Sequence, residues 1–598
     1  MFQDRLQAQL LPALQAAFQE LFGQAPEAKA ITFQATRPEF EGDVTINVFP
    51  FLKLSAKGPE QTATALGEHL KAHLPVVDRF NVVKGFLNIV VADGYWLEFL
   101  DVARTKDILR FPATGDQVMV EYSSPNTNKP LHLGHLRNIF LGFSMSRILQ
   151  AVGHEVVRVQ IINDRGIHIC KSMVAWRAYG NGETPMSSGL KGDKLVGKYY
   201  VAFDKVYKEE VAGLVAGGLS PEEAGKKAPI MLEAQEMLRQ WEANDPDVRA
   251  LWATMNGWVY DGFNATYAAM GVDFDKLYYE SETYLLGKQD VLDGMDEGIF
   301  FRKPDGSVWV DLTADGLDEK LLLRGDGTSV YITQDVGTAI RRFEEFPGLK
   351  RLIYTVGNEQ DYHFKVLFRI LKKLGYAWAD GLYHLSYGMV DLPSGKMKSR
   401  EGTVVDADDL IAEVIADAAG ATQAQGKLDD FTAREKEDLF RMIGLAALKY
   451  FLLKVDPRKR MLFDPKASID LQGHTGPFIQ YTYARIRSLL RKAGYGEGPA
   501  ERERGAAVSL GPGEKAVIKL LHQLPAALNE AAERMDPASL ANQAYELVKA
   551  YNAFYQSIPV LKEEDAGKRQ LRLELSAAVG IAVKKAMWCL GIEVPERM

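Results

Sequence analysis

The stretch from Glu121 to Asn138 reads EYSSPNTNKPLHLGHLRN, and it lies between a predicted strand and a predicted helix. The strand is QVMVEYSS at 117–124, and the helix is LRNIFLGFSMSRILQAVG at 136–153. A β-branched run, EVVRVQIIN at 155–163, follows the helix and predicts a second strand. A strand, a helix and a second strand in this order form a βαβ unit with parallel strands. The stretch therefore predicts an α/β fold with a doubly wound, Rossmann-like parallel sheet.

Within this stretch, His132, Gly134 and His135 form an HxGH motif at the start of the predicted helix. A helix N-terminus presents free N–H groups and a positive dipole end, and both favour phosphate. The glycine lets the backbone approach a nucleotide closely, and the imidazoles can donate hydrogen bonds as charge develops on phosphoryl oxygens. Taken alone, the motif would more often be an ordinary helix start. Its position directly after a strand favours a nucleotide site.

A second candidate is KMKSREG at 396–402, which follows the predicted strand LYHLSYGMV at 382–390. A lysine-rich loop near a triphosphate would neutralise the leaving pyrophosphate in the transition state. Alone, this loop could equally be a solvated basic turn. Two such motifs on strand-end loops of one predicted sheet are far more specific together. Either Lys396 or Lys398 could be the lysine that contacts the phosphates.

The chain divides into three predicted domains. Residues 1–112 open with an apolar-periodic helix, followed by short alternating strands, which indicates a small α+β domain. Residues 113–430 contain the predicted sheet, which a helix-rich insertion interrupts at about 176–270. One of the helices predicted to cover the sheet runs from 361 to 373. Residues 431–598 are almost wholly helical and predict an all-α bundle.

The net charge of −8 over 598 residues argues at first against a nucleic acid partner. Between Lys449 and Lys492, however, ten Lys and Arg stand against three acids, and such a stretch could bind phosphates or be a solvated face. The only cysteines, Cys170 and Cys589, have no partner at metal-ligand spacing, which excludes a zinc ribbon and favours a reducing cytoplasm. No apolar run approaches the roughly 18 residues of a membrane span, and the N-terminus does not resemble a signal peptide.

These motifs resemble those of class I aminoacyl-tRNA synthetases, with HLGH as the HIGH motif and KMKSREG as a variant of KMSKS. The resemblance is closest to the arginyl-tRNA synthetases and covers essentially the whole chain. The stretch 121–138 is similar to that family's extended signature, LANQAYELVKAYNAFYQSIPVL at 540–561 to its anticodon-binding domain, and the ending GIEVPERM is typical. EGDVTINVF at 41–49 resembles the family's added domain, which contacts the corner of tRNA. One departure is NDRG at 163–166, where the family often has Gly-Asp-Trp-Gly.

The resemblance implies an arginine–tRNA ligase that takes L-arginine, ATP with Mg²⁺, and tRNA(Arg). We expect a cytoplasmic monomer with no protein-bound metal or zinc and no membrane contact. The implied catalytic residues are His132, His135, Lys396 and Lys398. The implied ATP-binding residues are His132, Gly134, His135, His363, Met389, Lys396, Lys398 and Ser399. The implied arginine-binding residues are Ser124, Asn126, Glu280, Tyr331, Asp335 and Gln360. The predicted tRNA contacts are Tyr481, Tyr483, Arg485 and Arg487.

The arginine assignment also has a physical basis in the residues. A guanidinium needs a carboxylate that accepts its planar fork in two parallel hydrogen bonds. Tyr331 and Asp335 lead into a predicted helix at i, i+4 spacing, so the ring could stack on the apolar stem while Asp335 takes the charge. Spacing alone would favour an ordinary first-turn acid that stabilises the helix dipole. A site built on buried acids discriminates ~10⁴–10⁵-fold against ligands that cannot pair with those acids. We therefore expect no editing site.

The implied reaction begins with attack of the arginine carboxylate on the α-phosphorus of ATP, and a terminal ribose hydroxyl of tRNA then takes the arginyl group. The resemblance further implies that activation depends on bound tRNA. Three alternatives stay open: an HxGH nucleotidyltransferase that never touches tRNA, a non-catalytic tRNA-binding paralogue, and another class I synthetase. The long helical region after the sheet argues against the first. The intact histidines and lysines argue against the second.

Overall fold

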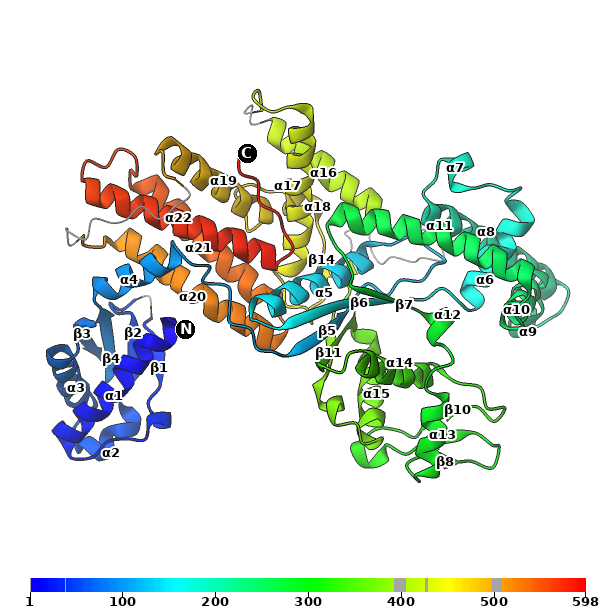
Figure 1. The fold of residues 1–598 in the computed structure, drawn as a ribbon, viewed down its shortest axis with the longest axis horizontal. Helices are drawn as coiled ribbons and strands as arrows, with labels where there is room; N and C mark the ends of the chain where they lie inside the picture. The colour runs from blue at the N-terminus through cyan, green and yellow to red at the C-terminus, as the bar shows by residue number, and fades with distance from the viewer. Residues whose placement is uncertain (1, 38, 392–404, 425–427, 497–507) are drawn as a thin grey trace.

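A computed structural model of the chain describes residues 2–37, 39–391, 405–424, 428–496 and 508–598. Three predicted ATP-binding residues, Lys396, Lys398 and Ser399, lie outside these ranges. Figure 1 shows a central sheet with a small N-terminal domain towards one end of the molecule and a helical insertion at the other. The C-terminal helices pack across the middle, beside the sheet.

Five parallel strands form the central sheet, in the order β12-β11-β5-β6-β7. Their bounds are Gln117–Glu121 (β5), Glu155–Ile162 (β6), Lys276–Tyr279 (β7), Leu349–Gly357 (β11) and Leu382–Tyr387 (β12). The chain adds β6 and β7 on one side of β5, then crosses over and adds β11 and β12 on the other. The order therefore reverses between β5 and β11, and sheets of this kind bind ligands at the carboxyl ends of the strands there. The predicted doubly wound sheet is confirmed.

Helices connect and cover these strands. Their bounds are Leu133–Ala151 (α5), Glu280–Thr283 (α12), Lys288–Asp296 (α13), Tyr331–Glu345 (α14), Asp361–Lys373 (α15) and Ala407–Gln423 (α16). The helix predicted at 361–373 is confirmed as α15. The crossover helix α5 is buried on almost every side, because the sheet covers one face and the C-terminal helices cover the others.

A three-stranded antiparallel sheet between α13 and α14 was not predicted. Its strands are Phe301–Arg302 (β8), Val308–Val310 (β9) and Lys320–Leu323 (β10), in the order β10-β9-β8. Strands of two to four residues are too short to show the alternation of apolar and polar residues from which a strand is recognised. The antiparallel pairing is therefore visible only in the structure.

The insertion between β6 and β7 is all helical. Its helices are Ile167–Tyr179 (α6), Pro185–Ser188 (α7), Gly192–Ala216 (α8), Pro221–Lys227 (α9), Pro229–Glu242 (α10) and Pro246–Met270 (α11). Helices α6, α8, α10 and α11 pack on one another, and Figure 1 shows the group projecting from the β7 side of the sheet.

The N-terminal domain packs its helices on a four-stranded antiparallel sheet of order β1-β2-β4-β3. The strands are Phe33–Ala35 (β1), Val44–Asn47 (β2), Val77–Val83 (β3) and Phe86–Val91 (β4). The helices are Phe2–Phe22 (α1), Leu52–Ser55 (α2), Pro59–His73 (α3) and Asp93–Ala103 (α4). The predicted α+β character of this domain is confirmed.

In its described residues, the C-terminal domain consists of helices apart from one short strand. Its elements are Ala433–Leu453 (α17), Met461–Leu462 (β14), Pro465–Ser468 (α18), Gly476–Lys492 (α19), Pro512–Arg534 (α20), Pro537–Ser557 (α21) and Ala566–Cys589 (α22). Strand β14 pairs in parallel with Val390–Asp391 (β13), which follows β12. Within the described ranges, no helix is long and apolar enough to cross a membrane.

The C-terminal helices share a core with the central sheet rather than forming a separate body. The Ser144 hydroxyl of α5 donates to the carbonyl of Cys589 at 3.1 Å. The Lys449 ammonium of α17 donates to the carbonyls of Met270 and Gly591 at 2.7 and 2.6 Å. Removal of α19–α22 would uncover the apolar surface of α5. A truncation after α18 is therefore expected to unfold, so it cannot isolate a role of these helices in binding.

The buried Lys449 makes stability depend on pH. Burial lowers its pKa to about 7, whereas a lysine in the unfolded chain titrates at about 10.4. Between these values the unfolded chain binds the additional proton, so raising the pH favours the folded state, by at most about 1.4 kcal/mol per pH unit. Below about pH 7 both states are protonated and the effect disappears. We predict that wild type gains stability relative to Lys449→Met as the pH rises from about 7 to about 9. Urea unfolding of both proteins would check this, and parallel pH profiles would contradict it.

Candidate active site

The HIGH motif begins α5 as a reciprocal cap. The Nδ1 of His132 accepts from the Gly134 N–H, and the Nδ1 of His135 accepts from the His132 N–H, both at 3.1 Å. Burial, together with the charge of Lys129, lowers the pKa of His132 to about 3, and burial lowers that of His135 well below its ordinary value. Both rings are thus neutral, and because each Nδ1 is an acceptor, each proton is on Nε2. The motif offers a ligand two Nε2–H donors.

The backbone just after β5 is held in a strained conformation. Ser123 and Ser124 have φ of 73° and 42°, in the left-handed region that non-glycine residues rarely adopt. The Asn138 Oδ1 on α5 accepts from the Ser123 N–H at 2.6 Å, and the Ser123 hydroxyl pairs with the Tyr267 hydroxyl at 2.6 Å. These contacts fix the turn that carries Ser124, one of the predicted arginine-binding residues.

The next predicted arginine-binding residue, Asn126, lies beside the end of β6. It forms a parallel bridge with Asn163, whose carbonyl accepts from the Thr127 N–H at 2.9 Å. The carboxyl ends of β5 and β6 are therefore in contact, and the residue after Asn163 is the buried Asp164.

Three acids meet at this edge of the sheet. Asp164 accepts from the Ser281 N–H and hydroxyl at 2.8 and 2.7 Å. Burial, together with the negative charges of Asp335 and Asp164, raises the pKa of Glu280 to about 7. Three carboxylates from β6, α12 and α14 thus share one small region, which favours binding of a cation. The prediction did not include Asp164, although an acid directly after a strand is the signal that could have identified it.

The predicted residue His363 is in direct contact with this cluster. Its Nε2 lies 2.6 Å from Oδ2 of Asp335, so α15 and α14 are joined at their first turns. The other predicted ligands have accessible side chains: Tyr331 is 77% exposed, Met389 is 47% exposed and Gln360 is also exposed. Tyr331 and Asp335 lie on the first two turns of α14, as their spacing predicted.

A buried ion pair holds α14 against the central strand. Arg342, which is 1% exposed, pairs with Glu121 at the end of β5. Its guanidinium lies 4.8 Å from the ring centroid of Tyr278 and 5.7 Å from that of Tyr354. Glu121 precedes the strained turn, and Arg342 is on the same helix as Asp335. This ion pair therefore determines how Asp335 is placed relative to the end of β5.

The chain that follows the undescribed residues returns directly beside the HIGH motif. Asp406 forms an antiparallel bridge with His132. The Leu133 N–H donates to the Val405 carbonyl at 3.3 Å, and the Ala407 N–H donates to the Leu131 carbonyl at 2.9 Å. A pocket of about 250 Å³ opens here, lined by Lys129, Pro130, Leu131, His132, Lys194, Gly197, Lys198, Tyr200, Val201 and Asp406. The described chain resumes three residues after the second motif and lies beside the HIGH motif, and the second motif itself lies outside the described residues.

The four predicted tRNA contacts on α19 differ in their surroundings. Tyr483 is 2% exposed and donates to Glu596 at 2.7 Å, so its hydroxyl stabilises the helix packing, and its contact with tRNA stays a prediction. Arg487 donates to the same carboxylate at 2.6 Å. Arg485 donates to Asn552 at 2.6 Å, and its guanidinium lies 4.8 Å from the ring centroid of Tyr481.

The basic stretch at 449–492 is likewise only partly a charged surface. Lys449 is buried, Lys454 donates to the His474 carbonyl at 2.8 Å and Arg460 is paired with Asp391. Helix packing directs these cations to acceptors inside the molecule. A count of charged residues in the sequence does not reveal this.

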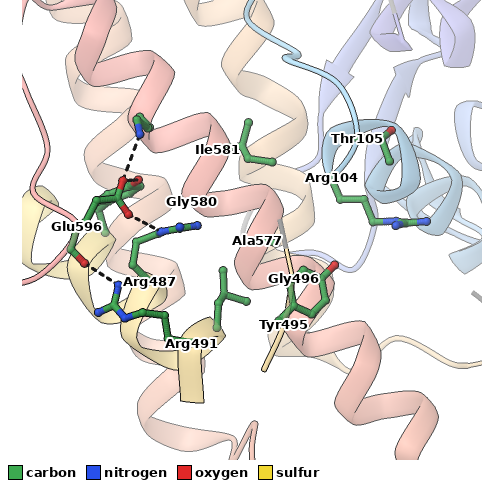
Figure 2. Close-up of a pocket in the computed structure, with 13 residues that line it drawn as sticks. Arg104, Thr105, Arg487, Arg491, Tyr495, Gly496, Ala577, Gly580, Ile581 and Glu596 are labelled. Atoms are coloured by element: carbon green, nitrogen blue, oxygen red, sulfur yellow. Dashed lines mark hydrogen bonds and ion pairs between the residues drawn. The ribbon is translucent and has the colours of Figure 1, made fainter. Parts of the chain in front are cut away.

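Near these residues lies a larger pocket of about 710 Å³ between α19, α22 and the end of α4 (Figure 2). Figure 2 shows Arg487 and Arg491 directed at Glu596 on one side, with Arg104 on the other. Lys584 of α22 also lines it. Four cations around one cavity, against one carboxylate, favour an anionic occupant.

Models of known protein families match all three parts of the chain. The family model described as tRNA synthetases class I (R), catalytic domain, matches residues 105–464. The model described as arginyl tRNA synthetase N terminal domain matches residues 5–91, and the DALR anticodon binding domain matches 479–598.

Individual relatives are similar along their full length. The chain is 55% identical over 599 residues to a Bacteroides thetaiotaomicron protein named arginine–tRNA ligase, and the match covers 100% of both chains. It is 55% identical to a protein of that name from Flavobacterium psychrophilum, covering 99% of this chain and 100% of the relative. The solved structure of the Thermus thermophilus arginyl-tRNA synthetase matches with a TM-score of 0.75 at 26% identity, covering 98% of this chain and 99% of that one.

The caps of α5 lead to a prediction about its two histidines. Because burial disfavours the charged ring, His132 should keep a neutral, Nε2-protonated ring from about pH 8 down to about pH 4, and His135 should stay neutral well below the ordinary pKa of histidine. Nitrogen-15 NMR of histidine-labelled protein would show this, with the signals assigned by comparison with His132→Gln and His135→Gln. A ring of either residue that titrates near its ordinary value would contradict the assignment.

Proposed function

The chain belongs to the arginyl-tRNA synthetase family of class I aminoacyl-tRNA synthetases, and from this premise we propose how its site holds arginine and ATP. Its activity is the ATP-dependent ligation of arginine to tRNA. We propose that the acids Asp164, Glu280 and Asp335 receive the guanidinium of L-arginine. The observation that carries this proposal is that the charges of Asp164 and Asp335 raise the pKa of Glu280.

The acidic cluster and the cation stabilise each other. In the empty pocket the three carboxylates repel one another and Glu280 is half-protonated near pH 7. A bound guanidinium would remove that repulsion, so Glu280 would release its proton and pair as a carboxylate. A guanidinium presents parallel N–H donors that match one carboxylate in a bidentate pair, whereas a lysine ammonium is a point charge. The same cluster therefore favours arginine over lysine.

The remaining predicted residues are proposed to hold the other groups of the two substrates. Ser124 and Asn126, at the end of β5, are proposed to hold the amino and carboxyl groups of arginine. The Nε2–H groups of His132 and His135 are proposed to donate to phosphoryl oxygens of ATP, with His363 and Met389 beside the nucleotide. Since the arginine carboxylate is already anionic, it attacks the α-phosphorus without a general base, and the bond from this phosphorus to the leaving pyrophosphate breaks. Neutral donors placed where charge develops then stabilise the transition state.

Several finer assignments belong to the same proposal. Mg²⁺ is proposed to enter with ATP, and Lys396 or Lys398 to contact the phosphates, which stays a prediction because both lie outside the described residues. Tyr481 and Arg485 of α19, together with the basic pocket of Figure 2, are proposed to contact tRNA. A cytoplasmic location is supported by Cys170 and Cys589, which are buried free thiols.

The acid of α14 provides the first test. Asp335→Asn should raise the Michaelis constant for arginine roughly 10–150-fold, because a charge-assisted hydrogen bond contributes about 1.5–3 kcal/mol. The constant for ATP should change little. Glu344→Gln removes one negative charge from the exposed end of the same helix and serves as the control. An arginine Michaelis constant that stays within about twofold of wild type in Asp335→Asn would exclude this residue from the pocket.

The second test concerns the dependence of activation on tRNA. We predict that pyrophosphate exchange into ATP is nearly absent with arginine alone and develops when tRNA(Arg) is added, as induced fit of the site by tRNA would produce. Lysine, glutamine and citrulline should support no exchange in either condition. Strong arginine-dependent exchange in nuclease-treated enzyme would contradict the coupling but keep the substrate. Exchange with citrulline would contradict the acidic pocket, because citrulline carries no charge.

A further inference from the structure

Arg137 is a buried arginine two residues after His135, and the structure gives it an unusual set of partners. It is 0% exposed. Its guanidinium donates to the carbonyl of Gly388 at 2.6 Å and to that of Pro457 at 3.1 Å. Longer contacts reach the carbonyls of Met389 at 3.5 Å and Asp456 at 3.4 Å. One side chain of α5 therefore joins the chain after β12 to the loop after α17.

These two acceptor segments also bind each other. The Gly388 N–H donates to the Pro457 carbonyl at 2.9 Å, and the Met461 N–H donates to the Met389 carbonyl at 3.1 Å. Strands β13 and β14 continue this pairing. A Cβ at Gly388 would lie 2.7 Å from the backbone N of Arg460, so the two segments approach as closely as glycine allows. Arg137 lies at the joint between the catalytic sheet and the C-terminal domain.

The charge of Arg137 is not matched by an acid. Among the residues that the structure describes, no carboxylate lies within ion-pair distance of its guanidinium, and its Nε has no partner. Burial lowers its pKa to about 10, so it is charged at neutral pH. Burial of this charge without an ion pair opposes folding. Its hydrogen bonds to the carbonyls of Gly388 and Pro457 hold two separate segments at a fixed distance from α5.

The geometry points to Arg137 as a positioning residue for adenylation: its fork sets the distance between the HIGH helix and the Gly388–Met389 backbone. This rests on the proposed function, in which both His135, on the HIGH helix, and Met389, on the Gly388–Met389 backbone, contact ATP. Both are tied to Arg137, His135 through the first turns of α5 and Met389 through its carbonyl. Through Asp456 and Pro457 the same fork transmits the position of the C-terminal domain to the nucleotide site.

The test is arginine-dependent pyrophosphate exchange by the full-length enzyme with saturating tRNA(Arg). Arg137→Lys keeps the charge but cannot reach both segments, since only the guanidinium fork spans them. We expect kcat to fall roughly 10–100-fold with the Michaelis constant for arginine within about twofold, because a misplacement of about 1 Å at a reacting group costs on the order of 10²-fold. Gly388→Ala, which separates the segments without altering Arg137, should give the same pattern.

The matched control is Arg147→Lys. Arg147 is on the same helix and also donates to a C-terminal carbonyl, that of Trp588 at 3.2 Å, but it touches neither acceptor segment. Its kcat should stay within about twofold of wild type. An equal loss in Arg147→Lys and Arg137→Lys, or a kcat unchanged in Arg137→Lys and Gly388→Ala, would overturn the proposal. His135→Ala, measured in parallel, distinguishes a failure of the Arg137 proposal from a failure of the proposed ATP site. If His135→Ala keeps the full rate, the proposed ATP site is wrong as well.

Discussion

The arrangement of the site depends on the first two turns of one helix. Helix α5 begins at the switch point of the sheet, where the carboxyl ends of β5 and β11 diverge. Its residues His132 and His135 cap its own N-terminus, Arg137 holds the chain after β12, and Asn138 holds the turn after β5. Because the C-terminal helices enclose α5, these turns have no freedom to shift relative to the strands.

Electrostatics differs between the two sides of the proposed site. On the β6 and α14 side, the carboxylates of Glu280, Asp335 and Asp164 oppose one another, and the charge of Arg165 offsets part of this repulsion at Glu280. On the α5 side, buried imidazoles are kept neutral and the positive charge of Lys129 is close by. The acidic side suits the proposed guanidinium, and the neutral donors suit the proposed triphosphate.

Charge composition was a weaker guide than the motifs. The basic stretch at 449–492 suggested a phosphate-binding surface, yet Lys449 and Arg460 end on acceptors within the protein. Tyr483, a predicted tRNA contact, is 2% exposed and donates to Glu596. Whether a charged or aromatic side chain faces solvent depends on which helices pack beside it, and a count of residue types contains no such information. The pocket of Figure 2, lined by Arg487 and Arg491, shows where cations do remain around a cavity.

The sequence by itself determined the doubly wound sheet, the three kinds of domain, the helix at 361–373 and the position of the HxGH motif at the start of α5. These follow from the periodicity of apolar residues and from caps, which act over a few neighbouring residues. Only the tertiary structure decided that Asp164 joins Glu280 and Asp335, that Arg342 pairs with Glu121, and that Arg137 reaches Gly388 and Pro457. These partners lie tens to hundreds of residues apart, and what brings them together is the packing of whole elements, for which local sequence has no signal.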